Sequence, residues 1–301
     1  MAGIQISGSR VLLTGASSGI GRELAKVLAE RGAVLAIAAR RRPLLESLAG
    51  EIAAAGQEPP AVLEADLSRR GAARALAGEA EGALGRVDVL VNNAGGGVGG
   101  TIAAVGDGDE GREAFEINYW SPLALVSALA PGMVERGGGA IVNVTSMAQV
   151  SSWIGFGGYA ATKAALGLAT ETLAMELSDS GVQVMEVMPG PVDTAVQGET
   201  RLAPGIERML GRSPLGDPAV MARLVAEALE KGRSRLIYPR RARVAYLLPA
   251  LVRRDIRRLA ARTVREMDPE VRDGFWSLVV RTGSTGDTRE AREAWDRRKK
   301  G

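Results

Sequence analysis

The chain has 301 residues, of which 46% are hydrophobic, so it is long enough and apolar enough to bury a substantial core. It contains neither cysteine nor histidine, which excludes a disulfide framework, a thiolate metal site and a histidine general base, and we expect no metal centre. Acid and base chemistry near neutral pH would therefore depend on Tyr, Lys, Asp or Glu.

The net charge of +3 is unevenly distributed along the chain. Residues 231–265 carry twelve Lys or Arg residues and a single acid, Asp255, so the remainder is net negative. Because the basic charge is confined to one segment, we expect no nucleic-acid partner. Residues 1–10 lack a basic stretch that leads into a long apolar core, and the uncharged stretch 137–162 contains many polar side chains, so we expect a cytoplasmic protein.

Short apolar runs alternate with stretches of helical period over the first two hundred residues. The run at 11–14 precedes a predicted helix at 21–32, and the run at 34–39 precedes a second helix at 43–55. Further apolar runs follow at 61–64, 87–91, 140–145, 182–187 and 235–238. Strands separated by helices favour right-handed crossovers and a parallel sheet, and their continuous apolar character indicates helices on both faces. We predict an α/β fold with a Rossmann-type doubly wound parallel sheet of about seven strands.

A glycine-rich turn separates the first predicted strand from the first predicted helix. Its glycines permit a tight turn and a close backbone approach, while the N–H groups and the dipole at the helix start attract a pyrophosphate. The turn contains Gly15, Ser17, Ser18, Gly19, Ile20 and Gly21. Because these glycines follow a strand and precede a helix, a dinucleotide site is favoured over an ordinary turn. We expect a dinucleotide-binding and catalytic domain at 1–240, followed by a basic helical C-terminal extension at 241–301.

Arginines follow the second predicted strand, where the ribose of a dinucleotide would lie. An acid at that strand end would bind a free 2′-hydroxyl, whereas arginine complements a 2′-phosphate through charge-assisted hydrogen bonds. Ala39 stands in the place of the acid, and Arg40 and Arg41 follow it. The residues favour NADP(H) as the cofactor; the alternative is a solvated basic cap on a loop.

A serine, a tyrosine and a lysine have a spacing that suits proton transfer. Ser146 follows a predicted strand, and Tyr159 and Lys163 stand one helical turn apart. Side chains at positions i and i+4 share one helix face, so the ammonium can lie near the phenol and favour its ionised form.

Together these motifs resemble the short-chain dehydrogenase/reductase family, in its single-domain branch, over residues 8–240. The matching residues beyond the glycine-rich turn are Asp66, Leu67, Asn93, Ala94, Gly95, Asn118, Ser146, Tyr159, Lys163, Pro189, Gly190, Val192 and Thr194. The resemblance implies an oxidoreductase that transfers a hydride between a nicotinamide and a carbonyl or secondary alcohol. A catalytically silent dinucleotide-binding regulator or scaffold is the alternative, against which the intact serine, tyrosine and lysine argue.

The resemblance also implies a role for each matching residue. Tyr159 would be the general acid/base, Ser146 would hydrogen-bond the substrate oxygen, and Lys163 would bind the nicotinamide ribose and lower the Tyr159 pKa. Asn118 would hold a water that links Lys163 to solvent, unless it is merely bonded to neighbouring backbone. The other cofactor contacts would come from Asp66 and Leu67 to adenine, from residues 93–95 to the adenosine ribose and from residues 189–194 to the carboxamide. Asp66 could instead be an acid at a helix start, and residues 189–191 only a turn.

The sequence says less about the substrate and the partners. Trp153, Ile154 and Phe156 precede Tyr159 in a chain with only 4% aromatic residues, which suggests a bulky apolar carbonyl or alcohol substrate. Packing in the core or in a subunit interface is the other explanation. The resemblance implies a homodimer or homotetramer that associates through the helices carrying Asn118 and Tyr159.

Residues 240–265 combine an apolar stripe with many arginines. The stripe recurs at helical spacing and contains Val244, Leu247, Leu248, Leu251, Val252, Ile256 and Leu259. Such a stripe is expected to be buried against another surface. We expect packing on the chain's own fold or on a second copy, and a peripheral contact with an anionic membrane is the alternative.

Overall fold

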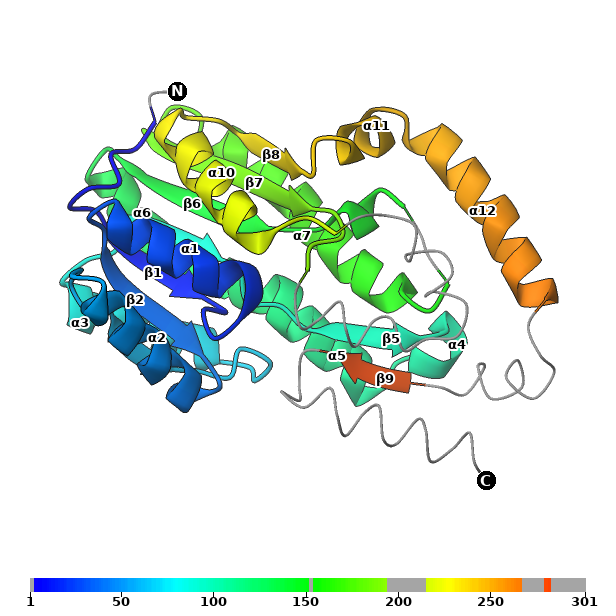
Figure 1. Cartoon of the computed structure of the whole chain (residues 1–301), viewed down its shortest axis with the longest axis horizontal. Coiled ribbons are helices and arrows are strands. Elements are labelled where there is room, and N and C mark those ends of the chain that lie inside the picture. The colour runs from blue at the N-terminus through cyan, green and yellow to red at the C-terminus, as the bar shows by residue number, and fades with distance from the viewer. Residues whose placement is uncertain (1–2, 152–153, 194–214, 267–278, 283–301) are drawn as a thin grey trace.

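A seven-stranded parallel sheet forms the centre of the computed structural model, which describes residues 3–151, 154–193, 215–266 and 279–282 (Figure 1). The strand order is β3-β2-β1-β4-β6-β7-β8. In chain order these strands are β1 (Arg10–Thr14), β2 (Val34–Ala39), β3 (Ala61–Glu64), β4 (Val89–Asn92), β6 (Gly139–Val144), β7 (Val182–Pro189) and β8 (Arg235–Tyr238). The predicted α/β fold with a Rossmann-type sheet of seven strands is confirmed.

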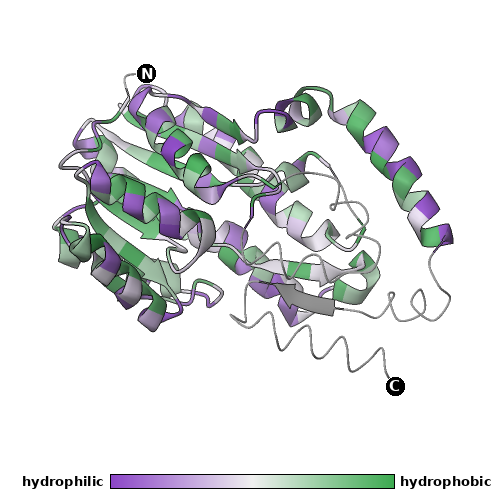
Figure 2. Cartoon of the chain, in the orientation of Figure 1, coloured by the Kyte–Doolittle hydropathy of each residue, from purple (hydrophilic) through white to green (hydrophobic). Residues whose placement is uncertain are grey.

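Helices cover both faces of this sheet (Figure 1). One face packs against α1 (Gly19–Glu30), α2 (Arg42–Ala54) and α10 (Pro218–Glu230). The other face packs against α3 (Ala72–Leu84), α6 (Ser121–Glu135) and α7 (Gly157–Glu176). Figure 2 shows predominantly hydrophobic strands between helices of mixed hydropathy, which is the distribution expected for a sheet that is buried on both faces.

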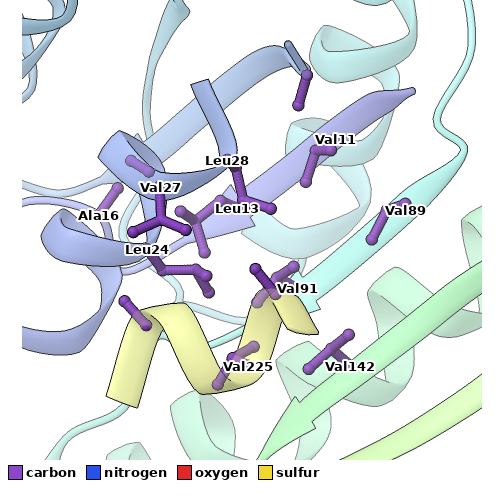
Figure 3. Packing of buried hydrophobic residues seen from close by; sticks show 14 of the residues in the cluster. Val11, Leu13, Ala16, Leu24, Val27, Leu28, Val89, Val91, Val142 and Val225 are labelled. Carbon is purple, nitrogen blue, oxygen red and sulfur yellow. The ribbon is translucent and has the colours of Figure 1, made fainter. Parts of the chain in front are cut away.

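The first strand illustrates why the sheet is apolar throughout. Leu13 packs with Leu24 and Leu28 of α1 and Val225 of α10, which belong to one buried cluster (Figure 3). Leu12 belongs to the cluster on the opposite face, because successive strand side chains point to opposite sides. Both leucines are fully buried, so neither position of the strand tolerates a polar residue.

The predicted boundaries differ from the observed ones by a few residues, with local causes. The helix predicted at 21–32 begins at Gly19, directly after the N-cap residue Ser18, and it ends at Glu30 because Gly32 adopts a left-handed φ of 78°. The strand predicted at 182–187 continues to Pro189, since it pairs with β8 as far as Tyr238. The strand predicted at 87–91 is shifted to Val89–Asn92.

The strand order reverses between β1 and β4, and the carboxyl ends of these two strands are where sheets of this kind have their ligand crevice. From β1 the chain proceeds outward through β2 and β3, and then returns through α3 to β4 on the other side of β1. The chain connections therefore lead away from β1 in opposite directions on its two sides. Open parallel sheets bind their ligands at such a point. Most of the predicted cofactor residues and Ser146 follow the carboxyl ends of β1, β2, β3, β4, β6 and β7, and Tyr159 and Lys163 stand on α7.

Smaller elements surround the crevice. They are β5 (Gly97–Gly100), α4 (Ile102–Val105), α5 (Asp109–Phe115), the π-helix η1 (Glu116–Trp120) and the 3₁₀-helix η2 (Met147–Gln149). The C-terminal extension contributes α11 (Ala242–Leu247), α12 (Pro249–Arg265) and β9 (Val279–Thr282). Besides these two helices, the extension contains one short strand that the sequence did not predict, β9, which pairs antiparallel with β5.

The apolar stripe of the extension is only partly buried. Ile256 is 8% exposed and Val252 is half-buried, so packing on the chain's own fold accounts for these two residues. The other five remain exposed to solvent, namely Val244, Leu247, Leu248, Leu251 and Leu259. Among the described residues, no helix has the length and hydrophobicity needed to cross a bilayer.

Candidate active site

The glycine-rich turn leaves no room for side chains. Gly15 adopts a left-handed φ of 70°, and a Cβ there would lie 2.7 Å from the Ala94 Cα. A Cβ on Gly21 would lie 2.3 Å from the carbonyl oxygen of Gly15. Ser18 is the N-cap residue of α1, yet its side chain makes no capping hydrogen bond. The turn and the helix start therefore have no room for further side chains and no side-chain cap, so their backbone N–H groups could hold a pyrophosphate.

Thr14 and Asn93 join the carboxyl ends of β1 and β4. The Thr14 hydroxyl accepts hydrogen bonds from the backbone N–H groups of Asn93 and Ala94, both at 3.0 Å. The Asn93 side-chain amide donates to the carbonyl oxygens of Thr14 at 2.9 Å and Gly15 at 3.1 Å. The predicted residues Asn93 and Ala94 thus lie directly against the glycine-rich turn, with Gly95 one residue further along.

The arginines after β2 reach two different parts of the same site. Arg41 donates from Nη2 to the hydroxyl oxygens of Ser17 at 3.1 Å and Ser18 at 3.3 Å, so its guanidinium lies on the glycine-rich turn. Burial alone would raise the pKa of Asp66, but hydrogen bonds from Ser68 and the charge of Arg40 hold that pKa below its ordinary value. The positive charge therefore lies beside both the turn and the carboxylate.

Asp66 and Leu67 follow β3 at the adenine end of the expected site. The Asp66 carboxylate accepts hydrogen bonds from the backbone N–H of Ser68 at 3.1 Å and from its hydroxyl at 2.7 Å. Leu67 is buried, and its carbonyl oxygen accepts a hydrogen bond from the Ser121 hydroxyl at 2.8 Å. The carboxylate is thus fixed in an ionised, hydrogen-bonded state at the edge of the crevice.

Ser146, Tyr159 and Lys163 converge as their spacing predicts. Ser146 follows β6 and caps η2, with its hydroxyl oxygen 3.1 Å from the backbone nitrogen of Ala148. Tyr159 stands in the first turn of α7 and forms a side-chain hydrogen bond with Ser146. The Lys163 Nζ atom lies 6.0 Å from the centre of the Tyr159 ring and donates to the carbonyl oxygen of Val144 at 3.0 Å.

Burial dominates the ionisation of the two titratable groups. It raises the pKa of Tyr159, whereas the hydrogen bond with Ser146 acts in the opposite direction. This net direction differs from the expected lowering by Lys163, because the phenol hydroxyl is desolvated although the side chain as a whole is half-buried. Burial also lowers the pKa of Lys163, which is 4% exposed, to about 8.

Asn118 is fully buried in the π-helix η1 and faces the turn that follows β4. Its amide nitrogen donates to the carbonyl oxygen of Gly96 at 2.6 Å, and its Oδ1 atom accepts from the Gly96 N–H at 3.3 Å. A Cβ on Gly95 would lie 3.0 Å from Asn118 Oδ1 and 3.4 Å from Lys163 Nζ. Asn118 therefore makes the hydrogen bonds to neighbouring backbone that were the alternative to a role in proton transfer. Its Oδ1 atom and Lys163 Nζ also both lie close to Gly95.

The stretch after β7 is described only in part. Pro189 ends the strand, the Gly190 N–H donates to the carbonyl oxygen of Tyr238 at 2.6 Å, and Val192 is buried. Thr194 lies outside the described residues, as does Trp153. Ile154 and Phe156 are both half-buried between η2 and α7.

A buried carboxylate beside Ser146 was missed by the sequence reasoning. Glu186 in β7 is 2% exposed and accepts hydrogen bonds from Thr145 Oγ1 at 2.9 Å, Gln149 Nε2 at 2.8 Å and Arg235 Nε at 2.6 Å. Thr145 precedes Ser146 in the chain and Gln149 ends η2, so this network fixes the segment that carries the serine. The feature of the sequence that indicates this buried carboxylate is a single acid, Glu186, within the otherwise uncharged strand β7.

The chain is similar to known proteins in sequence and in fold. Residues 9–204 match the short chain dehydrogenase family. The chain is 39% identical to dehydrogenase/reductase SDR family member 7B of Mus musculus over 61% of this chain and 58% of that protein. It is 33% identical to the 7alpha-hydroxysteroid dehydrogenase of Escherichia coli K12 over 73% of this chain and 86% of that protein. The match to a short chain dehydrogenase of Pseudocercospora fijiensis spans 62% of its length, so the chain covers less than two thirds of some of these relatives.

Two solved structures extend the likeness to the whole sheet. A short-chain dehydrogenase/reductase from Burkholderia phymatum in complex with NAD is 28% identical, with a TM-score of 0.72 over 83% of this chain and 97% of that one. A short-chain dehydrogenase from Sphingobium yanoikuyae in complex with NADPH is 29% identical, with a TM-score of 0.67 over 81% of this chain and 93% of that one. By sequence and by fold, this chain belongs to the short-chain dehydrogenase/reductase family.

Proposed function

We propose that this protein is an NADP(H)-dependent oxidoreductase that interconverts a carbonyl compound and the corresponding alcohol. The observation that carries the proposal is the convergence of Ser146, Tyr159 and Lys163 beside a glycine-rich turn that can cradle a pyrophosphate. The bound nicotinamide dinucleotide would supply the hydride for reduction or accept it in the reverse direction. The rest of the chemistry falls to this chain's own side chains.

Tyr159 is the proton donor in this proposal. Because burial raises its pKa, the phenol keeps its proton until negative charge develops on the substrate oxygen. Ser146 already hydrogen-bonds the phenol, and its hydroxyl can donate to the same substrate oxygen, which stabilises the developing charge. The two hydroxyl groups thus mark the position that the reacting oxygen would occupy.

Lys163 and Asn118 support this proton transfer. The Lys163 ammonium lies below the Tyr159 ring, where its positive charge stabilises the phenolate that forms after the proton has left. Its pKa of about 8 allows it to exchange a proton near neutral pH. Asn118 hydrogen-bonds Gly96, and its Oδ1 atom lies close to Gly95 as Lys163 Nζ does, so its side chain can position the route by which a proton returns to the site.

The preference for NADP(H) rests on the arginines after β2. Arg41 contacts both serines of the glycine-rich turn, and Arg40 is close enough to Asp66 to lower its pKa. A 2′-phosphate placed between them would meet two guanidinium groups and two hydroxyl donors. Ala39 supplies no carboxylate that would repel it. Known relatives bind NAD in one case and NADPH in another, so the family alone does not decide the preference.

We expect wild-type protein to use NADPH with a kcat/KM roughly 10 to 100 times that for NADH, since hydrogen bonds to charged groups contribute about 1.5–3 kcal/mol each. The double substitution Ala39→Asp with Arg40→Leu should reverse this preference, because the new carboxylate repels a 2′-phosphate and accepts a ribose hydroxyl. Arg42→Leu is the matched control, since Arg42 pairs with Glu46 at 2.8 Å on the exposed side of α2. The measurement is initial-rate kinetics over a panel of ketones. Equal or better efficiency of the wild type with NADH would overturn the assignment.

A bulky apolar substrate is part of the same proposal. Ile154 and Phe156 are half-buried next to Tyr159, and the name of the Escherichia coli relative assigns it a hydroxysteroid substrate. Association into a homodimer or homotetramer also remains a prediction. It is supported by exposed apolar side chains on the two expected helices, namely Trp120, Leu168 and Met175.

A further inference from the structure

The corner between α11 and α12 exposes apolar and basic side chains together. Its aliphatic members are Val244, Leu247, Leu248, Leu251 and Leu259, which are between 44% and 71% exposed. The basic side chains among them include Arg254, Arg258 and Arg262, which are 59% to 75% exposed. These eight residues are called the corner surface below. Figure 1 shows α12 projecting away from the sheet, and Figure 2 shows hydrophilic and hydrophobic turns alternating along it.

The charge of this region is strongly positive. Residues 240–266 contain nine arginines and two acids, Asp255 and Glu266. Both acids are paired within α12, Asp255 with Arg254 at 3.5 Å and Glu266 with Arg262 at 2.6 Å. Seven positive charges therefore remain in excess, in contrast to the net negative remainder of the chain.

The corner surface is attached to the candidate active site. Arg235 donates a hydrogen bond to the Tyr246 hydroxyl of α11, and its guanidinium carbon lies 4.8 Å from the centre of the Tyr246 ring. Arg253 of α12 donates to the carbonyl oxygen of Val150 at 2.9 Å, directly after η2. Ala242 and Ala245 of α11 pack on the cluster that contains Met147. The two helices that carry the corner surface are therefore fixed to the segment that carries Ser146.

Two kinds of occupant can be distinguished by charge. A second copy that used the same surface around a two-fold axis would place arginines opposite arginines, which is unfavourable. An anionic lipid surface instead offers phosphates to the guanidinium groups and acyl chains to the leucines between them. The separation of α11 from α12 at Pro249 and the shortness of both helices restrict such a contact to the membrane surface.

We propose that the corner surface binds an anionic lipid membrane peripherally, with the leucines inserted at the level of the headgroups and the arginines on lipid phosphates. The proposal is independent of the cofactor preference, because it concerns side chains outside the catalytic and cofactor sites.

The test is co-sedimentation of the full chain with two kinds of vesicle, one of pure phosphatidylcholine and one of equal parts phosphatidylcholine and phosphatidylglycerol. We expect binding to the mixed vesicles, weakened by salt, and little binding to the neutral ones. Arg254→Glu with Arg258→Glu should lower the partition coefficient at least about tenfold. Leu247→Ser with Leu248→Ser should also lower it about tenfold, because two apolar side chains no longer enter the lipid.

Two matched controls separate this surface from general properties of the protein. Arg70→Glu with Arg74→Glu makes the same change of net charge at exposed positions before and in α3, and should leave binding unchanged. Leu44→Ser with Ile102→Ser removes exposed apolar side chains from α2 and α4, outside the corner surface and the expected subunit interface, and should also have no effect on vesicle binding. Thermal denaturation should show unchanged folding for all four variants. The proposal is overturned by failure to bind the mixed vesicles, by equal binding to both vesicles, or by equal losses in test and control variants. It is also overturned if light scattering shows that Leu247 and Leu248 instead mediate self-association.

Discussion

Tyr159→Phe is expected to lower kcat by roughly 10²–10⁴-fold while the protein still folds and binds its cofactor. The ring remains in place between Ser146 and Lys163, so the packing survives, but the transferable proton is lost. Ser146 can still donate to the substrate oxygen, which accounts for a small residual rate. The measurements are steady-state turnover, thermal denaturation and the dissociation constant of the dinucleotide from fluorescence titration.

Tyr238→Phe is a matched control for this substitution. Its hydroxyl accepts a hydrogen bond from the backbone N–H of Asp217 at 3.0 Å, away from Ser146 and Lys163, so its removal should leave turnover almost unchanged. If Tyr159→Phe kept its activity within about tenfold of wild type, which is about 1.4 kcal/mol of barrier, Tyr159 could not be the proton donor.

Lys163→Met is expected to abolish turnover and, at neutral pH, to make the protein more stable. The pKa of Lys163 is about 8 in the folded protein and 10.5 for a free side chain, so the unfolded state binds its proton more tightly. Below pH 8 the lysine is charged in both states, and the difference destabilises the fold by about 3 kcal/mol. Loss of the hydrogen bond to Val144 offsets about 1 kcal/mol of the gain, which leaves roughly 2 kcal/mol.

The pH dependence of this difference provides its check. As pH rises from 8 to 10.5, the folded protein releases the Lys163 proton first, so wild-type stability should approach that of Lys163→Met. Urea unfolding of both proteins between pH 7 and the alkaline limit measures the difference directly. If Lys163→Met is less stable than wild type at pH 7, or if the difference in stability does not change with pH, burial does not destabilise the charged form of Lys163.

The sheet could be predicted from the sequence because its central strands are apolar on both faces. Val11, Leu12 and Leu13 contribute to two buried clusters on opposite sides of β1, so hydrophobicity alone identifies the strand. The pairing of β5 with β9 could not be predicted from the sequence. Val98 is the one residue of β5 that is not glycine, and β9 lies far along the chain from β5. The π-helical turn around Asn118 was also missed, since it depends on hydrogen-bond register and not on apolar period.

The sequence predicted which residues form the candidate site better than it predicted the pKa shifts and charge contacts of those residues. The spacing of Tyr159 and Lys163 predicted that they share one helix face, and the family resemblance predicted that Ser146 joins them. The spacing could not reveal that burial outweighs neighbouring charge at Tyr159, because desolvation depends on everything that surrounds the hydroxyl. Nor could it distinguish Arg41 on the glycine-rich turn from Arg40 beside Asp66.

The apolar stripe of the extension shows that helical spacing in the sequence does not predict which residues are exposed. Helical spacing predicted one apolar face, but α11 ends at Leu247 and α12 begins at Pro249, so the stripe does not run along one helix. Ile256 is buried, while Leu247 and Leu251 face solvent. Periodicity therefore identified apolar residues correctly and could not say which of them the fold covers.

Hydride transfer to a carbonyl carbon with Tyr159 as proton donor is tested most directly with NADPH that carries deuterium on nicotinamide C4. The labelled NADPH is incubated with wild-type protein and a panel of bulky apolar ketones. We predict that mass spectrometry will find deuterium on the carbinol carbon of at least one product, and that Tyr159→Phe will form that product far more slowly. Wild-type protein that binds NADPH yet transfers deuterium to no carbonyl in the panel would contradict the account and favour a dinucleotide-binding protein without catalytic activity.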